Sequence, residues 1–286
     1  MRLDELGDVA ELRLDDQRTV HYLRAGSGRP LVLLHTIRTQ LEYFTDVVPM
    51  LTEHYTVYVL DLPGHGRSSK PTTVEYDEPY LRRGVVDTMA MLDLREVTMV
   101  GDSIGAVLAL TVASQVPKSV VRVVASNPYD YDTRFADGIR RGNRFADLVL
   151  GGVALPGVGP VLGAAENKFV TSRIFQGGLA DGKRIPGPLL DEFDATLKRP
   201  GFHYVERNVY QNWRSWGAAR DLYAGVTAPV TLVYGEQDWS RPVERARTAR
   251  ALNVEPIVLP ETGHFAFLER PQRLAEIVIG HPDPSI

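Results

Sequence analysis

The best-placed candidate nucleophile in this sequence is Ser103, which stands between two glycines in Gly101-Asp102-Ser103-Ile104-Gly105. The apolar, β-branched run Val97–Val100 before it predicts a strand, and the small apolar residues after it predict a helix. In this context the spacing G-x-S-x-G is typical of a tight turn that presents a reactive serine hydroxyl. Alternatively, Ser103 is an ordinary helix cap. Its assignment as a nucleophile therefore depends on whether a base and an orienting acid lie beside it.

A serine hydroxyl needs a base that accepts its proton, and His264 is the preferred candidate. This histidine comes shortly after the apolar run Ile257–Leu259, which predicts the last strand. Loops at the carboxyl ends of parallel strands share one edge of the sheet, so we expect His264 to meet Ser103 there. His21 and His54 lie in or beside predicted strands, where packing or surface roles are expected.

Asp238 is the candidate that would orient the histidine, because a carboxylate at this point can accept a hydrogen bond from the imidazole Nδ1–H. It comes shortly after the predicted strand Val230–Tyr234. Three alternatives remain open. Asp238 could simply cap the following helix, Glu236 lies nearer the strand end, and Asp130 follows the earlier predicted strand Val120–Ala125.

The elements that must position these residues alternate between short apolar strands and helices, which predicts an α/β fold with a mostly parallel sheet flanked by helices. Eight strands are expected, at Glu11–Leu14, Thr19–Leu23, Leu31–Leu34, Val57–Leu60, Val97–Val100, Val120–Ala125, Val230–Tyr234 and Ile257–Leu259. Helical spacing marks Gln40–Leu51, Tyr80–Leu92, Ala106–Gln115, Leu189–Leu197, Val205–Trp216, Val243–Leu252 and Phe265–Ile279.

The alternation is interrupted once. We expect residues 1–127 and 225–286 to form one α/β core, and residues 128–224 to form a helical cap inserted into it. Inside the insertion, Leu148–Ala165 carries no charge over nearly the length of a membrane span. Pro156 and Pro160 would break a continuous helix, so two short apolar pieces with a bend are expected instead.

Composition excludes several classes of function. The chain has 286 residues, a net charge of −4 and no cysteine, which argues against nucleic-acid binding, disulfides and thiolate chemistry. The N-terminus lacks the pattern of a signal peptide, so a cytoplasmic location is expected. Gly177–Arg184 resembles a phosphate-binding loop but has Arg184 where Ser or Thr would bind magnesium. The glycine-rich segment around Asp61 and His65 suits a tight turn, so neither nucleotide, metal nor other cofactor is expected.

The order Ser103, Asp238, His264 resembles that of the α/β-hydrolase superfamily, and the chain is similar to its cap-bearing serine hydrolases. The resemblance covers nearly the whole chain except the insertion. Besides the serine turn, it rests on Leu34-His35, on Asp61-Leu-Pro-Gly-His-Gly-Arg-Ser68, on Gly235-Glu-Gln-Asp238 and on Gly263-His264. It implies the α/β-hydrolase fold, with Ser103, Asp238 and His264 as catalytic residues.

An oxyanion hole needs two backbone N–H groups, and Ile104, directly after the serine at a helix start, should provide one. By position in the family, the other donor is Ile37. Family members usually have glycine after the histidine, whereas this chain has Thr36. Either the loop takes a different path, or Thr36 and Arg38 contact the substrate; Arg38 as a surface charge is equally compatible with the sequence. Trp239, beside Asp238, is a further candidate substrate contact.

The resemblance implies an esterase-like enzyme that cleaves a carboxylic ester or lactone through an acyl-enzyme on Ser103. A serine nucleophile argues against dehalogenase and epoxide hydrolase chemistry, which similar folds perform with aspartate at that position. Alternatives are a ring-cleavage carbon–carbon bond hydrolase, an acyltransferase or tailoring enzyme, and a hydrolase-derived ligand receptor. The expected partner is a small molecule with an apolar acyl part. The segment Leu148–Leu162 is expected either to line an acyl pocket or to pack on the core.

Overall fold

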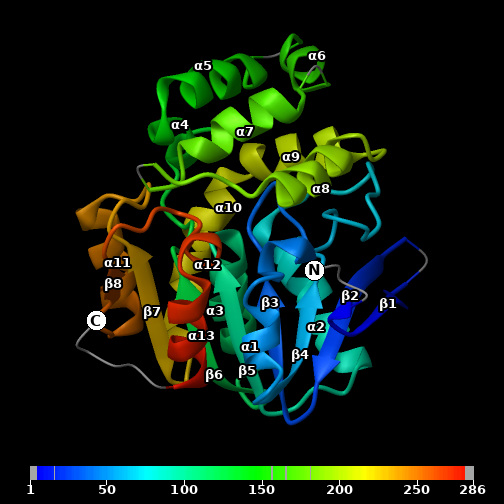
Figure 1. The fold of residues 1–286 in the computed structure, drawn as a ribbon, viewed down its shortest axis with the longest axis vertical. Coiled ribbons are helices and arrows are strands. Elements are labelled where there is room, and N and C mark those ends of the chain that lie inside the picture. The colour runs from blue at the N-terminus through cyan, green and yellow to red at the C-terminus, as the bar shows by residue number, and fades with distance from the viewer. Residues whose placement is uncertain (1–4, 16, 156, 165, 181, 281–286) are drawn as a thin grey trace.

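A computed structural model describes residues 5–280 except 16, 156, 165 and 181. Eight strands form one sheet in the order β1-β2-β4-β3-β5-β6-β7-β8, as Figure 1 shows. The first two strands pair antiparallel and the other six run parallel to one another. The predicted mostly parallel, eight-stranded sheet is therefore confirmed. The strands are β1 Asp8–Arg13, β2 Thr19–Gly26, β3 Arg29–Leu34, β4 Tyr55–Leu60, β5 Val97–Asp102, β6 Val120–Ser126, β7 Val230–Gly235 and β8 Ile257–Leu259.

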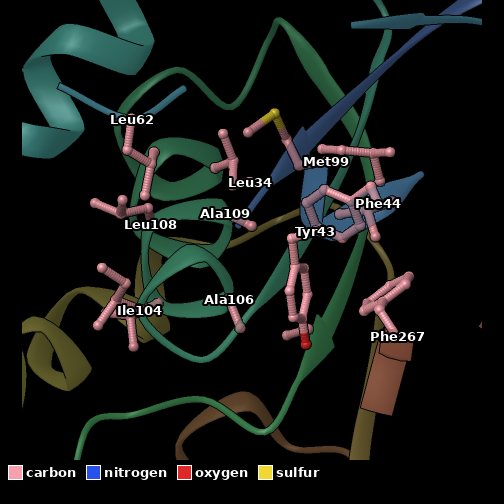
Figure 2. Close-up of a cluster of buried hydrophobic side chains, with 14 of the residues drawn as sticks. Leu34, Tyr43, Phe44, Leu62, Met99, Ile104, Ala106, Leu108, Ala109 and Phe267 are labelled. Carbon is pink, nitrogen blue, oxygen red and sulfur yellow. The ribbon is translucent and has the colours of Figure 1, made fainter. Parts of the chain in front are cut away.

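Helices cover both faces of the sheet, and α3 (Ile104–Gln115) is the most deeply buried of those around the serine turn. It contains no charged residue, and its first ten residues are all buried. Figure 2 shows its side chains packed with Leu34 and Met99 of the sheet, and with Phe44 and Phe267 from neighbouring segments. Burial of each such large side chain contributes about 1.5–3 kcal/mol, so α3 is a rigid support. The other core helices are α1 Val48–Leu51, α2 Glu78–Met91, α11 Pro242–Leu252, α12 Ala266–Glu269 and α13 Pro271–Ile279.

Three predicted helices are each divided in two. Gln40–Leu51 forms a 3-10 turn, η2 (Leu41–Phe44), and then α1, whose first turn contains Pro49. Proline starts a helix well but cannot continue the hydrogen bonding of a preceding turn. Phe265–Ile279 divides at Arg270, which leaves the helical region because the next residue is Pro271. Val205–Trp216 divides at Asn212.

Between β6 and β7 the described part of the chain contains helices and no strand. We refer to α4–α10 as the inserted helices; they lie beyond one end of the sheet in Figure 1. None of the helices described is long and apolar enough to cross a bilayer. Their bounds are α4 Asp137–Gly142, α5 Arg144–Val153, α6 Gly159–Ala164, α7 Lys168–Gln176, α8 Gly187–Leu197, α9 Phe202–Gln211 and α10 Trp213–Ala218, after which η3 (Ala219–Gly225) leads to β7.

The turn after β4 is organised by the buried carboxylate of Asp61. One oxygen accepts the backbone N–H of Leu41 at 2.8 Å, and the other accepts the N–H of Arg67 at 2.7 Å and bonds His21 Nδ1 at 2.9 Å. A Cβ on Gly66, whose φ is +48°, would meet this carboxylate at 2.2 Å. The glycine-rich motif therefore serves to join β2, β4 and the loop after β3.

Two neutral histidines lie beside this turn. His35 donates from Nδ1 to the Thr36 carbonyl at 2.7 Å and accepts the Leu62 N–H at Nε2 at 3.0 Å, which leaves no site for a second proton. His65 packs edge-on against His35 with ring centroids 5.3 Å apart and bonds the Pro63 carbonyl at 3.1 Å. Burial lowers the pKa of both rings, that of His65 to about 3.

This burial predicts that stability falls in acid. The unfolded chain binds a proton at each histidine below about pH 6.5, whereas the folded chain does not, so the stability present above that pH is lost as the pH falls. His65→Asn keeps a donor for the Pro63 carbonyl but does not titrate. We expect its free energy of unfolding, measured with urea, to drop about 2 kcal/mol less than wild type between pH 7.5 and 5.0. Exposed His54→Asn is the control, and equal drops in all three proteins would contradict the assignment.

Candidate active site

The turn between β5 and α3 holds Ser103 in an unusual backbone conformation, with φ +59° and ψ −118°. Positive φ is costly for a residue with a side chain and persists only where its surroundings enforce it. At both flanking glycines, neighbouring backbone packs closely enough to hold the turn in this conformation. A Cβ on Gly101 would meet the Gly105 carbonyl at 2.1 Å, and one on Gly105 would meet the Leu34 carbonyl at 2.1 Å. The glycine spacing thus follows from backbone contact on both sides of the serine.

The structure brings Ser103, His264 and Asp238 together at the carboxyl edge of the sheet. His264 Nε2 lies 2.9 Å from Ser103 Oγ. Its Nδ1 is hydrogen-bonded to Asp238 Oδ1. Because the carboxylate accepts the Nδ1 proton, the unprotonated Nε2 faces the serine hydroxyl and can take its proton. Ser103 and His264 are fully buried, so bulk water does not compete for these hydrogen bonds.

Asp238 is held in its charged form. Burial acts to raise the pKa of Asp238, but the interaction with His264 and hydrogen bonds from Ser240 outweigh burial, and the pKa is lowered. The hydroxyl and the backbone N–H of Ser240 both donate to Asp238 Oδ2, and the backbone nitrogen lies 3.0 Å from this oxygen. Asp238 therefore satisfies both its oxygens while it orients the imidazole.

The two competing acids lie elsewhere. Asp130 is buried, accepts a hydrogen bond from Thr248 Oγ1 at 2.8 Å and pairs with Arg220 at 3.6 Å. Glu236 accepts the N–H of Glu261 at 3.1 Å on an exposed turn. Among the described residues neither carboxylate is joined to His264 by a hydrogen bond or an ion pair.

Trp239 and Asn127 support the histidine. The Trp239 ring stacks on the His264 ring at 3.9 Å between centroids, and its Nε1–H donates to the Gly177 carbonyl at 2.8 Å. Asn127, which sequence reasoning missed, donates to the His264 carbonyl at 2.9 Å and accepts the Gly235 N–H at 2.9 Å. The signal that could have found it is its position directly after β6, at the same sheet edge.

The backbone N–H groups of Ile37 and Ile104 are the expected oxyanion donors. Neither donates a hydrogen bond to another residue within the described chain. Ile104 opens α3, where the helix dipole favours negative charge. Ile37 follows Thr36, whose carbonyl accepts from the His35 ring at 2.7 Å and from Thr39 Oγ1 at 2.8 Å. These contacts fix the path of the loop in the absence of the usual glycine.

Arg38 is buried with φ +65°, so its interpretation as a surface charge is wrong. Its guanidinium pairs with Glu166, which precedes α7, and with Glu206 of α9. Burial and the nearby Glu166 raise the pKa of Glu206, and the Arg38 charge only partly offsets this rise. Arg38 is therefore occupied by carboxylates of the inserted helices, whereas Thr36 Oγ1 is buried without a hydrogen-bond partner among the described residues.

The same carboxylates and His203 place their polar atoms within 4.8 Å of one another, a spacing that could hold a metal ion. Arg38 already supplies a cation to both glutamates at this position. A dication would have to displace a buried guanidinium that can reach both carboxylates at once, which disfavours metal binding.

A second residue whose role sequence reasoning missed is Asp102, directly before the serine. Asp102, inside the G-x-S-x-G motif, is fully buried and accepts a hydrogen bond from the Tyr43 hydroxyl of η2. Burial raises the pKa of Asp102 to about 7. The contact joins the serine turn to η2, which follows the loop that carries Ile37. An acidic residue inside the motif was the available signal.

Comparisons with known proteins agree with this fold. A family model described as alpha/beta hydrolase fold matches residues 29–150. Over 271 residues the chain is 32% identical to the 2-hydroxy-6-oxo-6-(2'-aminophenyl)hexa-2,4-dienoic acid hydrolase of Metapseudomonas resinovorans, covering 90% of this chain and 85% of that one. It is 30% identical over 281 residues to an uncharacterized protein of Mycobacterium tuberculosis, covering 91% and 79%.

Among solved structures, the epoxide hydrolase CorEH matches with a TM-score of 0.79 at 20% identity, covering 97% of this chain and 99% of that one. This likeness concerns the fold alone. With the relatives above, the chain belongs to the α/β-hydrolase superfamily, as its sequence motifs predicted.

The choice of acid can be tested by substitution. We expect Asp238→Asn to slow the reaction of a fluorophosphonate with Ser103 by about ten-thousandfold, because the imidazole loses its orienting acceptor. Asp130→Asn, which changes an equally buried carboxylate, should react within a few-fold of wild type. Intact-mass spectrometry measures the labelling rates, which show which carboxylate orients His264. Melting temperatures check that each variant is folded. A larger loss in Asp130→Asn would move the acid to β6.

The buried cluster at Arg38 predicts a stability change. Arg38→Gln leaves two carboxylates buried without a cation and should cost about 3–5 kcal/mol of unfolding free energy. Adding Glu166→Gln and Glu206→Gln removes the unpaired charges, so the triple variant should recover most of this loss. Urea denaturation at pH 7.5 measures both. A single variant as stable as wild type would show that the ion pairs do not hold the loop.

Proposed function

We propose that the protein hydrolyses a carboxylic ester or a lactone through an acyl-enzyme on Ser103. The observation that carries the proposal is the hydrogen-bonded chain in which Asp238 bonds His264 Nδ1 and His264 Nε2 lies 2.9 Å from Ser103 Oγ. This arrangement raises the nucleophilicity of a hydroxyl that is otherwise too weakly acidic to attack.

In the acylation half, Ser103 Oγ attacks the substrate carbonyl carbon while its proton passes to His264 Nε2. The carbonyl oxygen becomes negative, and the N–H groups of Ile37 and Ile104 stabilise it. The tetrahedral intermediate then expels the alcohol, which takes the proton from His264. In the second half, His264 removes a proton from water, the resulting hydroxide attacks the acyl-enzyme, and the proton returns to Ser103 as the acid leaves.

Two features of the site support an ester or lactone as substrate. The residue at the turn is serine, whereas the dehalogenases and epoxide hydrolases of similar fold are expected to use aspartate there. Asp102 does not replace it, because it is buried and bonded to Tyr43. Arg38, the cation nearest the expected oxyanion donor in sequence, is already paired with Glu166 and Glu206. An uncharged substrate therefore suits the site better than a carboxylate.

A carbon–carbon bond hydrolase is the second candidate. Its support is the 32% identity to the dienoic acid hydrolase of Metapseudomonas resinovorans over most of both chains. Such a reaction would use the same serine and histidine on a ketone. It would also require a partner for the substrate carboxylate, a role that the paired Arg38 does not fill in this arrangement.

A substrate panel separates the candidates. We expect hydrolysis of short p-nitrophenyl esters and of lactones, and a loss of at least about a thousandfold in Ser103→Ala because the nucleophile is removed. Ser27→Ala, an exposed serine between β2 and β3, is the control and should match wild type. Faster turnover of a 2-hydroxy-6-oxo-dienoate than of any ester would favour the second candidate. Halide release from a haloalkane by Ser103→Ala would overturn both.

A further inference from the structure

Large apolar side chains are exposed together on α5, on α6 and at the start of α7. Leu148, Val161 and Phe169 are 76%, 70% and 66% exposed. The expectation that Leu148–Leu162 lines an acyl pocket or packs on the core is therefore wrong for its outward side. Figure 1 shows α5 and α6 at the end of the molecule farthest from the sheet, with α7 next to them on the side of the sheet. The exposed set is Leu148, Leu155, Val158, Val161, Leu162 and Phe169, which we call the apolar face.

The apolar face extends over more than one helix, because the exposed side of α5 itself carries Leu148 beside the charged Arg144 and Asp147. On α5 the inner side is already apolar, with Ala146, Leu150 and Val153 buried. Because α5 lies against both α6 and α7, these exposed apolar residues gather on neighbouring elements, which marks an interaction site rather than scattered exposure.

A basic groove adjoins the apolar face. A hollow of about 370 Å³ is lined by Arg173, Lys183 and Arg184 together with uncharged residues, and a neighbouring hollow of about 310 Å³ shares Arg173 and adds Arg144. No acidic residue lines either hollow within the described chain. Lys183 is paired with Glu269 at 3.5 Å, whereas Arg173 and Arg184 form no ion pair among the described residues.

Aromatic contacts connect the groove to the apolar face. The Arg173 guanidinium lies over the ring of Phe145, 6.0 Å from its centroid, and this ring contacts Phe169 at 6.1 Å between centroids. Neither Arg173 nor Arg144 forms an ion pair with any carboxylate of the described residues. Residues 140–184 carry seven Arg or Lys against three Asp or Glu, in a chain whose net charge is −4. Four of these seven cations are paired with carboxylates, namely Arg140, Arg141, Lys168 and Lys183. The cations left without an ion pair among the described residues are Arg144, Arg173 and Arg184, which lie beside the apolar face.

We propose that this face docks on an anionic membrane surface. The apolar side chains of α5 and α6 enter the boundary between headgroups and acyl chains, and Phe169 enters beside them. Arg144, Arg173 and Arg184 contact the lipid phosphates. Apolar residues with a cationic border are the signature of segments that lie in the plane of an interface. Such docking places the inserted helices, rather than the sheet, against the lipid.

Vesicle co-sedimentation tests the proposal with the whole chain. Wild type should bind vesicles of phosphatidylcholine containing about a third phosphatidylglycerol and should bind pure phosphatidylcholine much less. High salt should weaken binding, because it screens the arginines. The double variant Leu148→Glu/Val161→Glu should bind at least about tenfold more weakly, and Arg173→Ser should also lose affinity.

The matched control is Met91→Glu/Val243→Glu. It places the same two charges on apolar residues of α2 and α11 that are 53% and 52% exposed and do not belong to the apolar face. This variant should bind vesicles nearly as wild type does. The proposal fails if wild type does not bind anionic vesicles, or if the two double variants lose binding equally. It also fails if the face instead drives self-association, seen by light scattering as a mass that falls to that of one chain in Leu148→Glu/Val161→Glu.

Turnover of a soluble ester distinguishes a failure of the membrane-docking proposal from a failure of the proposed function. The residues changed on the apolar face do not contact Ser103, His264 or Asp238 in the structure. Hydrolysis of a short p-nitrophenyl ester should therefore be the same in wild type and in both double variants. Vesicle binding without ester turnover would support the membrane-docking proposal and contradict only the proposed reaction.

Discussion

The backbone of Ser103 is the constraint on which the site depends. A side-chain-bearing residue at φ +59° is stable only if its neighbours prevent relaxation. Here the deeply buried helix α3 cannot move away from the sheet, and backbone packs directly against both flanking glycines. The same turn places the Ile104 N–H at a helix start and the Ser103 hydroxyl against His264. Hydrophobic packing thus holds the polar atoms in place.

Buried polar side chains join the loops that carry the other groups. Asp61 ties the loop after β3 to the turn after β4, and Asn127 ties the His264 loop to the end of β7. Asp102 adds a link from the serine turn to Tyr43. A buried group of this kind is costly unless it is satisfied, so each one favours a single arrangement of its loop. The sheet edge is therefore organised by a few carboxylate and amide groups.

Residues that lie a few positions after predicted strands could be located from the sequence. Ser103, Asp238 and His264 each follow an apolar run, and parallel strands bring such positions to one edge. The strand positions themselves were predictable because buried strands are short continuous apolar runs. The division of the last helix at Arg270 could also have been predicted, since Pro271 follows it.

Contacts between the inserted helices and the core could not be predicted. Glu166 and Glu206 reach Arg38 from positions more than 120 residues away in the sequence, and nothing in their local pattern indicates this pairing. The apolar pattern of Leu148–Leu162 likewise shows which residues are apolar, but not whether another element covers them. Periodicity records the faces of a helix, whereas burial depends on how the whole chain packs.

The pairing of Arg38 has a thermodynamic consequence. Both of its carboxylate partners belong to the segment between β6 and β7, whereas Arg38 itself belongs to the loop that carries Ile37. Any movement of Glu166 or Glu206 away from that loop must therefore separate buried opposite charges. The arrangement of the loop that carries Ile37 and the position of the segment between β6 and β7 are therefore linked, so a ligand that stabilises one arrangement of the loop must also favour one position of that segment.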